Sequence, residues 1–177
     1  DTIGKRSVAL LKFADTYRSL NKINSLTMSE IYVRDLFENQ HNLMMPTLLG
    51  RNIELEIILK DPNIKVLADK NLVEQVLINL IVNAMEAVKQ SEHPKIILSA
   101  AMDPQKRCII KVTDNGHGVP AELLDQIFIP FFSTKKNGTG IGLNLCKQIM
   151  LLHKGSIQVQ TVEGAGTSFI MTFNALY

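Results

Sequence analysis

Two asparagines, Asn79 and Asn83, are the first residues whose type and spacing could do chemistry. They lie four residues apart in a segment with a strong helical repeat, so they share one helix face that is otherwise apolar. Amides on a packed face must find partners or cost stability, and backbone groups could be those partners. Their oxygens could instead be hard ligands for Mg²⁺, which takes few ligands from protein and others from phosphate and water. Glu86 follows Asn83 by about one turn.

A second candidate is Asp114, which ends a strand-like segment and is followed by Gly116 and Gly118. Glycine admits positive φ and lets a ligand approach the backbone closely. The carboxylate could accept a hydrogen bond from an exocyclic amine, and such a charged bond is worth about 1.5–3 kcal/mol. The alternative is a tight turn, since Asp, Asn and Gly are common turn residues.

A third candidate is the glycine-rich segment 137–143, which runs into a helical pattern. Such a loop can offer backbone N–H groups and the positive end of a helix dipole to phosphate, or it can be a flexible loop without a ligand. It fits neither a Walker A loop nor a Rossmann fingerprint. Lys135 and Lys136 precede it and could reach a phosphate as point charges. The segment 164–167 predicts by itself only a hairpin turn.

Hydrophobic periodicity predicts the elements that position these residues. We expect helices over 5–20, from Ser29 to about Pro46 or Gly50, over 69–90 and over 141–153. Strands are expected over 53–57, 95–101, 107–113, 156–161 and 167–173, with a long irregular stretch after Gly116. This mixed order indicates an α/β (α+β) two-layer sandwich, in which helices cover one face of a mixed, mostly antiparallel sheet.

Composition bounds the class of protein. The 177 residues are 46% hydrophobic and 20% charged, as in a globular domain with at most a short appendage. A net charge of +2 gives no reason to expect nucleic acid. No apolar run reaches the roughly 20 residues of a membrane span, and no signal peptide opens the sequence, so we expect a cytoplasmic environment. Cys108 and Cys146 are expected to be buried, small apolar residues.

Taken together, in this order and spacing, the motifs resemble the nucleotide-binding boxes of the ATPase family that joins gyrase, the ninety-kilodalton heat-shock chaperones, histidine kinases and MutL. Residues 79–87 resemble the asparagine box, and the Asp114-x-Gly-x-Gly segment resembles the first glycine box. Residues 127–135 are similar to the phenylalanine box of histidine kinases. Residues 138–143 and 164–167 resemble the second and third glycine boxes, so the resemblance covers roughly residues 30–175.

The resemblance implies ATP and Mg²⁺ as cofactors and a role for each matching residue. Asn83 would be the metal ligand, Asn79 would support the phosphate side, and Asp114 would accept from the adenine amine. Asn79 and Lys135 would be the catalytic pair, with Lys135 on phosphate oxygens, and residues 119–140 would form a lid. The remaining nucleotide-binding positions would be Gly116, Gly118, Gly138, Thr139, Gly140, Ile141, Gly142, Leu143 and Thr167.

Position 79 separates the branches of the family. Hydrolysing members carry a glutamate base one turn before the metal asparagine, whereas this chain has Asn79, and a neutral amide cannot take a proton from water. A histidine nucleophile needs no such base. The resemblance therefore implies the catalytic domain of a two-component sensor histidine kinase, which passes the γ-phosphoryl group to a histidine and then to a response regulator aspartate. The alternatives are an ATP-hydrolysing conformational ATPase and a nucleotide-dependent binding module.

The N-terminal segment implies a second unit. Residues 1–27 resemble the end of the dimerisation hairpin in nitrogen-regulation sensors, which would make a homodimer, and residues 28–177 would be the catalytic domain. His41 and Pro46 have the spacing of a phosphoacceptor box without its acidic residue, so we expect the acceptor histidine upstream of Asp1. We expect His93, His117 and His153 to be surface or loop residues. Any inner-membrane anchor would lie outside this fragment.

Overall fold

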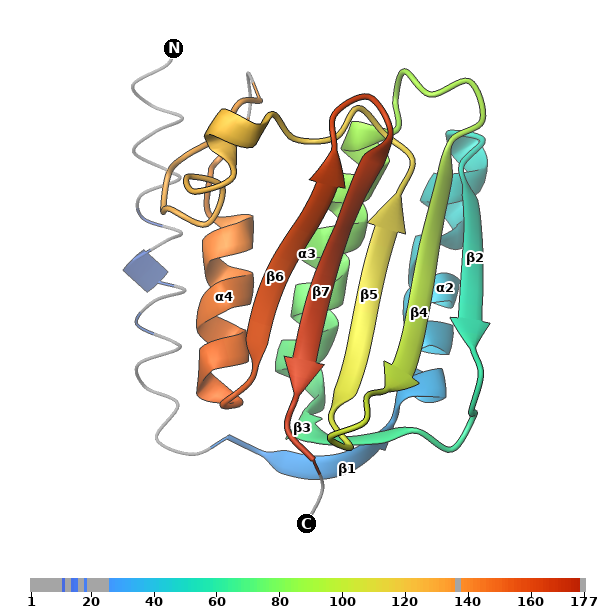
Figure 1. The fold of residues 1–177 in the computed structure, drawn as a ribbon, viewed down its shortest axis with the longest axis vertical. Helices are drawn as coiled ribbons and strands as arrows, with labels where there is room; N and C mark the ends of the chain where they lie inside the picture. Colours follow the sequence, from blue (N-terminus) through green and yellow to red (C-terminus); the bar gives the residue numbers. More distant parts are fainter. Residues whose placement is uncertain (1–10, 12–13, 16–17, 19–25, 136–137, 176–177) are drawn as a thin grey trace.

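A five-stranded sheet forms one layer of the molecule, and three helices form the other (Figure 1). The computed structural model describes residues 11, 14–15, 18, 26–135 and 138–175. The strand order is β2-β4-β5-β7-β6, with β2 and β4 parallel and the other neighbours antiparallel. The predicted fold class is confirmed. The strands are β2 (Glu54–Leu59), β4 (Lys95–Met102), β5 (Cys108–Asp114), β6 (Ser156–Val162) and β7 (Gly166–Phe173).

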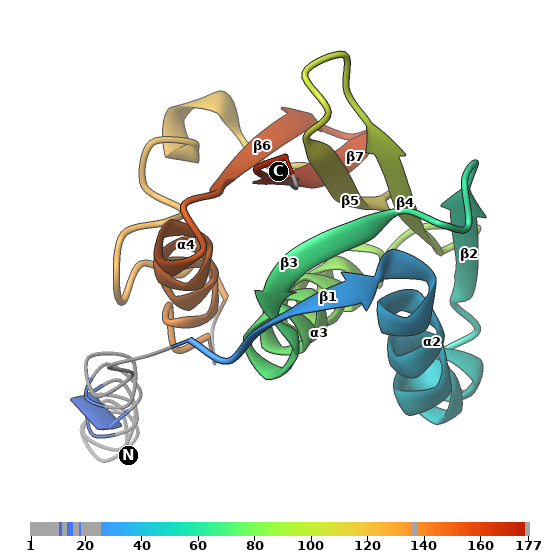
Figure 2. The ribbon, with the colours of Figure 1, turned by 90° about the horizontal axis from the view of Figure 1, so that it is seen from below.

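The helices α2 (Val33–Gly50), α3 (Lys70–Ala87) and α4 (Gly142–Leu152) lie side by side on one face of the sheet, as the view from below shows (Figure 2). α3 is central and begins at the predicted N-cap, since Asp69 accepts a hydrogen bond from the Leu72 amide at 3.3 Å. Its buried residues recur at helical spacing and pack against the sheet: Val73, Val76, Leu77, Leu80, Ile81, Ala84 and Met85.

The core lies between these two layers, and it fixes which face each strand side chain takes. In β5 every second residue is buried, from Cys108 through Ile110 and Val112 to Asp114. Asp114 therefore ends the strand on the helix-facing side, because side chains alternate along a strand. Cys108 on this strand and Cys146 on α4 are both buried, as predicted.

One predicted boundary is wrong. Residues Met28–Tyr32 form strand β1 rather than the start of a helix, and α2 begins only at Val33. β1 pairs antiparallel with β3 (Lys65–Asp69), a strand that periodicity did not reveal, and this ribbon crosses below the helices (Figure 2). The cause is long-range pairing, because Met28 and Asp69 become partners only in the folded chain.

The predicted helix over 5–20 lies outside the described residues, apart from Leu11, Ala14, Asp15 and Arg18, which are helical. The boundary near residue 27 and the dimerisation role of that helix stay predictions. Within the part of the chain that the structure describes, no helix is long and apolar enough to cross a membrane.

His153 is also not where the sequence predicted it. It is 7% exposed at the end of α4, where its Nε2 accepts from the Asp69 amide at 3.0 Å and its Nδ1 lies 2.8 Å from the Ile149 carbonyl oxygen. Because Nε2 is an acceptor, Nδ1 carries the proton and donates to that carbonyl. The side chain thus ties α4 to the start of α3. His93 and His117 are exposed as predicted, and His41 lies on α2.

Candidate nucleotide site

The predicted site residues gather at one end of the two layers, where α3 and β5 end and α4 begins (Figure 1). On α3, Asn79 and Asn83 are both partly buried, as their shared face requires. The Asn79 Nδ2 atom is buried and has no hydrogen-bond partner among the described residues. α4 begins beside it, because a methyl group on Gly142 would lie 3.8 Å from Asn79 Cγ. A buried donor without a partner is costly, so this atom is suited to an acceptor that comes from outside the chain.

The start of α4 adds further donors. Its N-cap residue is Ile141, and none of the described side chains caps it. The first backbone N–H groups of a helix have no partner within the helix and carry the positive end of its dipole. These N–H groups and Asn79 Nδ2 are donors of the kind that hydrogen-bond to phosphate oxygens.

Asn83 contacts segment 119–140, which is the predicted lid and is called the lid below. The Lys135 Nζ donates to Asn83 Oδ1 at 3.0 Å, across 52 residues of sequence. Partial burial of the ammonium group lowers the pKa of Lys135, while the nearby Glu86 carboxylate favours its charged form and Lys89 opposes it. Asn83, Glu86 and Lys135 thus form one polar cluster beside the buried amide of Asn79.

Asp114 lies at the end of β5 and is 6% exposed. Its Oδ1 accepts from the Gly116 amide at 2.8 Å. Burial raises the pKa of Asp114 above 3.8, and hydrogen bonds from the backbone of Gly116 and Thr167 act against this rise. A buried carboxylate with lone pairs to spare is a strong acceptor for a neutral amine.

Thr167 pairs with Asp114 across β5 and β7 and belongs to a hydroxyl network that includes Thr161. The Thr161 hydroxyl donates to the Gly166 carbonyl at 2.9 Å, accepts from the Val119 amide at 2.9 Å and lies 3.0 Å from the Thr167 hydroxyl. Its single proton is used on Gly166, so Thr167 is the donor between the two threonines. Thr161 belongs to no motif, and nothing in the sequence singled it out.

Three glycines let the backbone close around Asp114. A Cβ on Gly116 would collide with the Ala87 carbonyl oxygen, and one on Gly166 would collide with the Asp114 carbonyl oxygen. Gly118 has a φ of 74°, and its Cβ would lie 2.5 Å from the Val162 oxygen. The end of β5 therefore packs directly against the end of α3 and the hairpin between β6 and β7.

The segment after Gly118 is irregular apart from a 3-10 turn over Ala121–Leu123. It is held to α4, because Asn144 Nδ2 donates to the Phe128 carbonyl at 3.0 Å, and the Phe131 amide donates within the segment to the Gly140 carbonyl at 2.9 Å. Ile127, Phe128 and Leu143 pack against the core. Gly138 and Thr139 are exposed, and the Gly138 amide donates within the lid to the Lys135 carbonyl at 3.1 Å.

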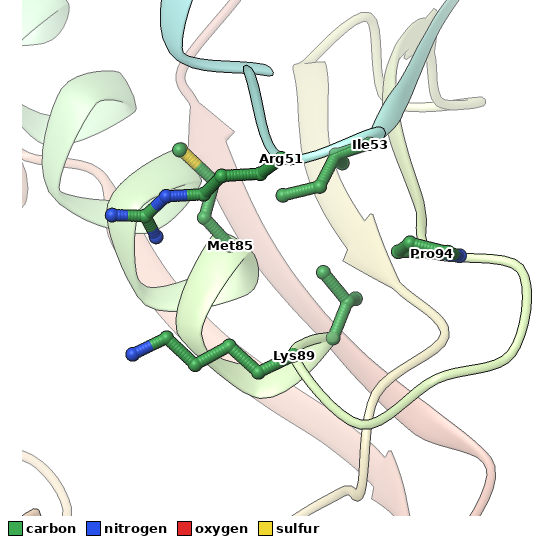
Figure 3. Close-up of a pocket in the computed structure, with 6 residues that line it drawn as sticks. Arg51, Ile53, Met85, Lys89 and Pro94 are labelled. Carbon is green, nitrogen blue, oxygen red and sulfur yellow. The ribbon is translucent and has the colours of Figure 1, made fainter. Parts of the chain in front are cut away.

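A separate pocket of about 410 Å³ lies on the α2 side of the end of α3 (Figure 3). Arg51 and Lys89 lie at its edge, and both form ion pairs with Glu86, Arg51 at 3.1 Å. None of its lining residues is one that the sequence predicted to hold nucleotide. They are Arg51, Ile53, Met85, Val88, Lys89 and Pro94.

Comparison with known proteins decides between the families that could build such a site. Residues 68–176 match a family model described as histidine kinase-, DNA gyrase B-, and HSP90-like ATPase. The sensor histidine kinase ZraS of Salmonella typhi is 32% identical over 167 residues, which are 94% of this chain and 36% of that protein. The chain belongs to this ATPase family. Sporulation kinase D of Bacillus subtilis (strain 168) is 38% identical over 122 residues, 68% of this chain and 24% of that kinase.

Among solved structures of this ATPase family, the catalytic domain of the histidine kinase ThkA in a nucleotide-free form has a TM-score of 0.76 and 32% identity. The likeness covers 84% of this chain and 96% of that domain. The chain is thus similar to the ATP-binding catalytic domain of sensor histidine kinases. It spans about a third of the length of ZraS and less of the sporulation kinase.

Proposed function

We propose that this chain binds Mg-ATP and that, within the whole protein, it transfers the γ-phosphoryl group to a histidine outside the chain. The observation that carries this proposal is Asp114, an almost fully buried carboxylate at the open end of β5. The fold gains little from an ionised group there, because burial raises its pKa. An adenine amine would give the carboxylate a donor in a site that excludes water.

The phosphate end of the nucleotide would lie between α3 and α4. Asn79 Nδ2, which lacks a partner among the described residues, and the uncapped start of α4 would donate to phosphate oxygens. Asn83 offers an amide oxygen of the type Mg²⁺ accepts, so we propose it as the protein ligand. Bound there, the metal would offset the charge of the phosphate groups during transfer.

The chain's own chemistry in this proposal is positioning. Asn79 cannot act as a base, and an imidazole acceptor needs none, because it is partly neutral near pH 7. Lys135 would donate to phosphate oxygens from the lid, and Gly138, Thr139, Gly140 and Ile141 would let the lid approach them. A response regulator would take the phosphoryl group next. ThkA has been solved in complex with the response regulator protein TrrA.

The role of residues 1–27 as the end of a dimerisation hairpin and a cytoplasmic location belong to the same proposal. Relatives named sensor histidine kinases, such as ZraS, support it.

The test is autophosphorylation by the intact protein that contains this chain. We expect acid-labile phosphate on a histidine outside residues 28–177, and its loss in Asp114→Asn. Glu92→Gln, which changes an exposed carboxylate, is the matched control and should leave the product unchanged. Steady release of inorganic phosphate without phosphohistidine, abolished by Asn79→Ala, would instead support a conformational ATPase.

A further inference from the structure

The contact between Lys135 and Asn83 joins the lid to α3. The ammonium group of Lys135 reaches the Asn83 Oδ1 atom at 3.0 Å. The hydroxyl of Ser133, two residues before Lys135, accepts from the Lys135 amide at 3.1 Å. A local turn therefore orders the backbone before the lysine. The Lys135 side chain therefore reaches α3 from a part of the lid whose backbone is held by a hydrogen bond.

The charges around this contact offset part of the burial effect that lowers the pKa of Lys135. Glu86 lies three residues after Asn83 and stabilises the charged form of Lys135. Lys89 opposes it, but Lys89 and Arg51 both pair with Glu86 on the other side. The cluster thus has one carboxylate among three cations, and Asn83 Oδ1 supplies Lys135 with an uncharged acceptor.

Asn83 Oδ1 is also the atom proposed to ligate metal. Two cations on one amide oxygen would lie within a few ångströms of each other and repel. The oxygen can therefore serve the lysine or the metal, but not both together.

We propose that Lys135 is a latch that holds the lid on α3 by occupying the amide oxygen of Asn83, and that loading the site with metal and nucleotide requires this bond to break. The latch follows from the contact itself, whereas the claim that metal and nucleotide must break this bond rests on the proposed function. The lysine that leaves Asn83 would then be free for phosphate oxygens, so one side chain would exchange partners as the lid changes state.

Amide hydrogen exchange of the nucleotide-free chain tests the latch. The amides of Phe131 and Gly138 report on the lid, because each donates to a carbonyl within it. We expect Lys135→Met, which keeps most of the length and removes the charge, to speed their exchange by about three- to tenfold, as for net loss of one ordinary hydrogen bond. Lys60→Met, at an exposed lysine outside the cluster, should change nothing.

Asn83→Ala and the double variant, which carries both Lys135→Met and Asn83→Ala, complete a double-mutant cycle. If the two side chains act through one bond, Asn83→Ala speeds lid exchange as Lys135→Met does, and the double variant is no faster than either. Exchange within α3 shows whether each variant is folded. If Asn83→Ala is not folded, Lys135→Met alone decides. Lid exchange in Lys135→Met that stays within twofold of wild type would overturn the latch. So would a double variant in which the accelerations of lid exchange from the two single variants multiply.

A second arm separates the latch from the proposed function. The side-chain amide resonance of Asn83 is followed while Mg²⁺ and a non-hydrolysable ATP analogue are added to the wild-type chain. We expect it to shift with the analogue and Mg²⁺, and the difference between wild-type and Lys135→Met lid exchange to disappear. A lid that loosens in Lys135→Met in a chain that binds no nucleotide supports the latch and overturns the proposed function. A chain that binds nucleotide but whose lid exchange is unchanged by Lys135→Met supports the proposed function and overturns the latch.

Discussion

Asp114 is buried at the end of β5, and burial raises its pKa above 3.8. Between the unfolded and the folded pKa, the folded protein binds more protons than the unfolded chain. The contribution of Asp114 to the free energy of unfolding therefore falls as pH rises through this window, and the cost persists at higher pH. The ionised Asp114 carboxylate thus lowers the free energy of unfolding, and a ligand that donates a hydrogen bond to it would offset this loss.

Asp114→Asn should remove this cost, because an amide oxygen can still accept from the Gly116 amide. We expect the variant to be as stable as wild type or more stable at pH 7, with an advantage that shrinks as pH falls toward 4. Thermal unfolding between pH 4 and 7 checks this. A variant that is less stable at pH 7, with a deficit that disappears at low pH, would contradict the assignment.

The two cysteines carry another prediction at this scale. Burial raises the pKa of both the Cys108 and the Cys146 thiol to about 12. Thiolate is the reactive form, so native protein at pH 8 should react with an alkylating reagent only as fast as it opens. Mass spectrometry after timed labelling measures this rate. Rapid labelling of either cysteine in protein with native circular dichroism would show that the thiol is accessible.

At the scale of elements, close backbone approach between the end of α3 and the turn after β5 shapes the site. Gly116→Ala should cost roughly 1–3 kcal/mol of stability, because its Cβ would meet the backbone of Ala87 and that backbone must shift. The matched control is Gly50→Ala at the end of α2, where a Cβ meets nothing within 4 Å. This change should stabilise the protein by about 0.4–1 kcal/mol. Urea unfolding measures both, and equal effects would contradict the packing.

His153 joins two elements through hydrogen bonds to the Asp69 amide and the Ile149 carbonyl. His153→Ala leaves two backbone groups without these partners and opens a space beside Phe173, so we expect a loss of about 2–4 kcal/mol. His93→Ala, at an exposed position, should stay within about 0.5 kcal/mol of wild type. Similar denaturation midpoints for the two variants would show that His153 does not join α4 to α3.

Sequence reasoning predicted those parts of the fold that depend on local pattern. The period of α3, its cap at Asp69 and the alternation in β5 all come from neighbours in sequence, and the structure has them. The prediction failed for elements and contacts that depend on residues far apart in the sequence. β1 and β3 exist only as a pair, Thr161 contacts Thr167 across a hairpin, and His153 is buried by elements that precede it by many residues.

At the scale of the whole molecule, two groups of residues lie at the same end of the two layers. Asp114 at the end of β5 pairs with Thr167, Lys135 of the lid contacts Asn83 on α3, and Gly142 at the start of α4 lies beside Asn79. An adenine base near the first group and phosphates near the second would span this end of the molecule, which is the central claim of the proposed function.

Calorimetric titration of this chain with Mg-ATP, wild type beside Asp114→Asn, tests that claim most directly. We expect one site in the wild type and an affinity at least about tenfold weaker in the variant, because a hydrogen bond to a buried carboxylate is worth about 1.5–3 kcal/mol. Equal affinity in both proteins would contradict the role of Asp114. Absence of binding by wild-type chain that is folded by circular dichroism would contradict the nucleotide site itself.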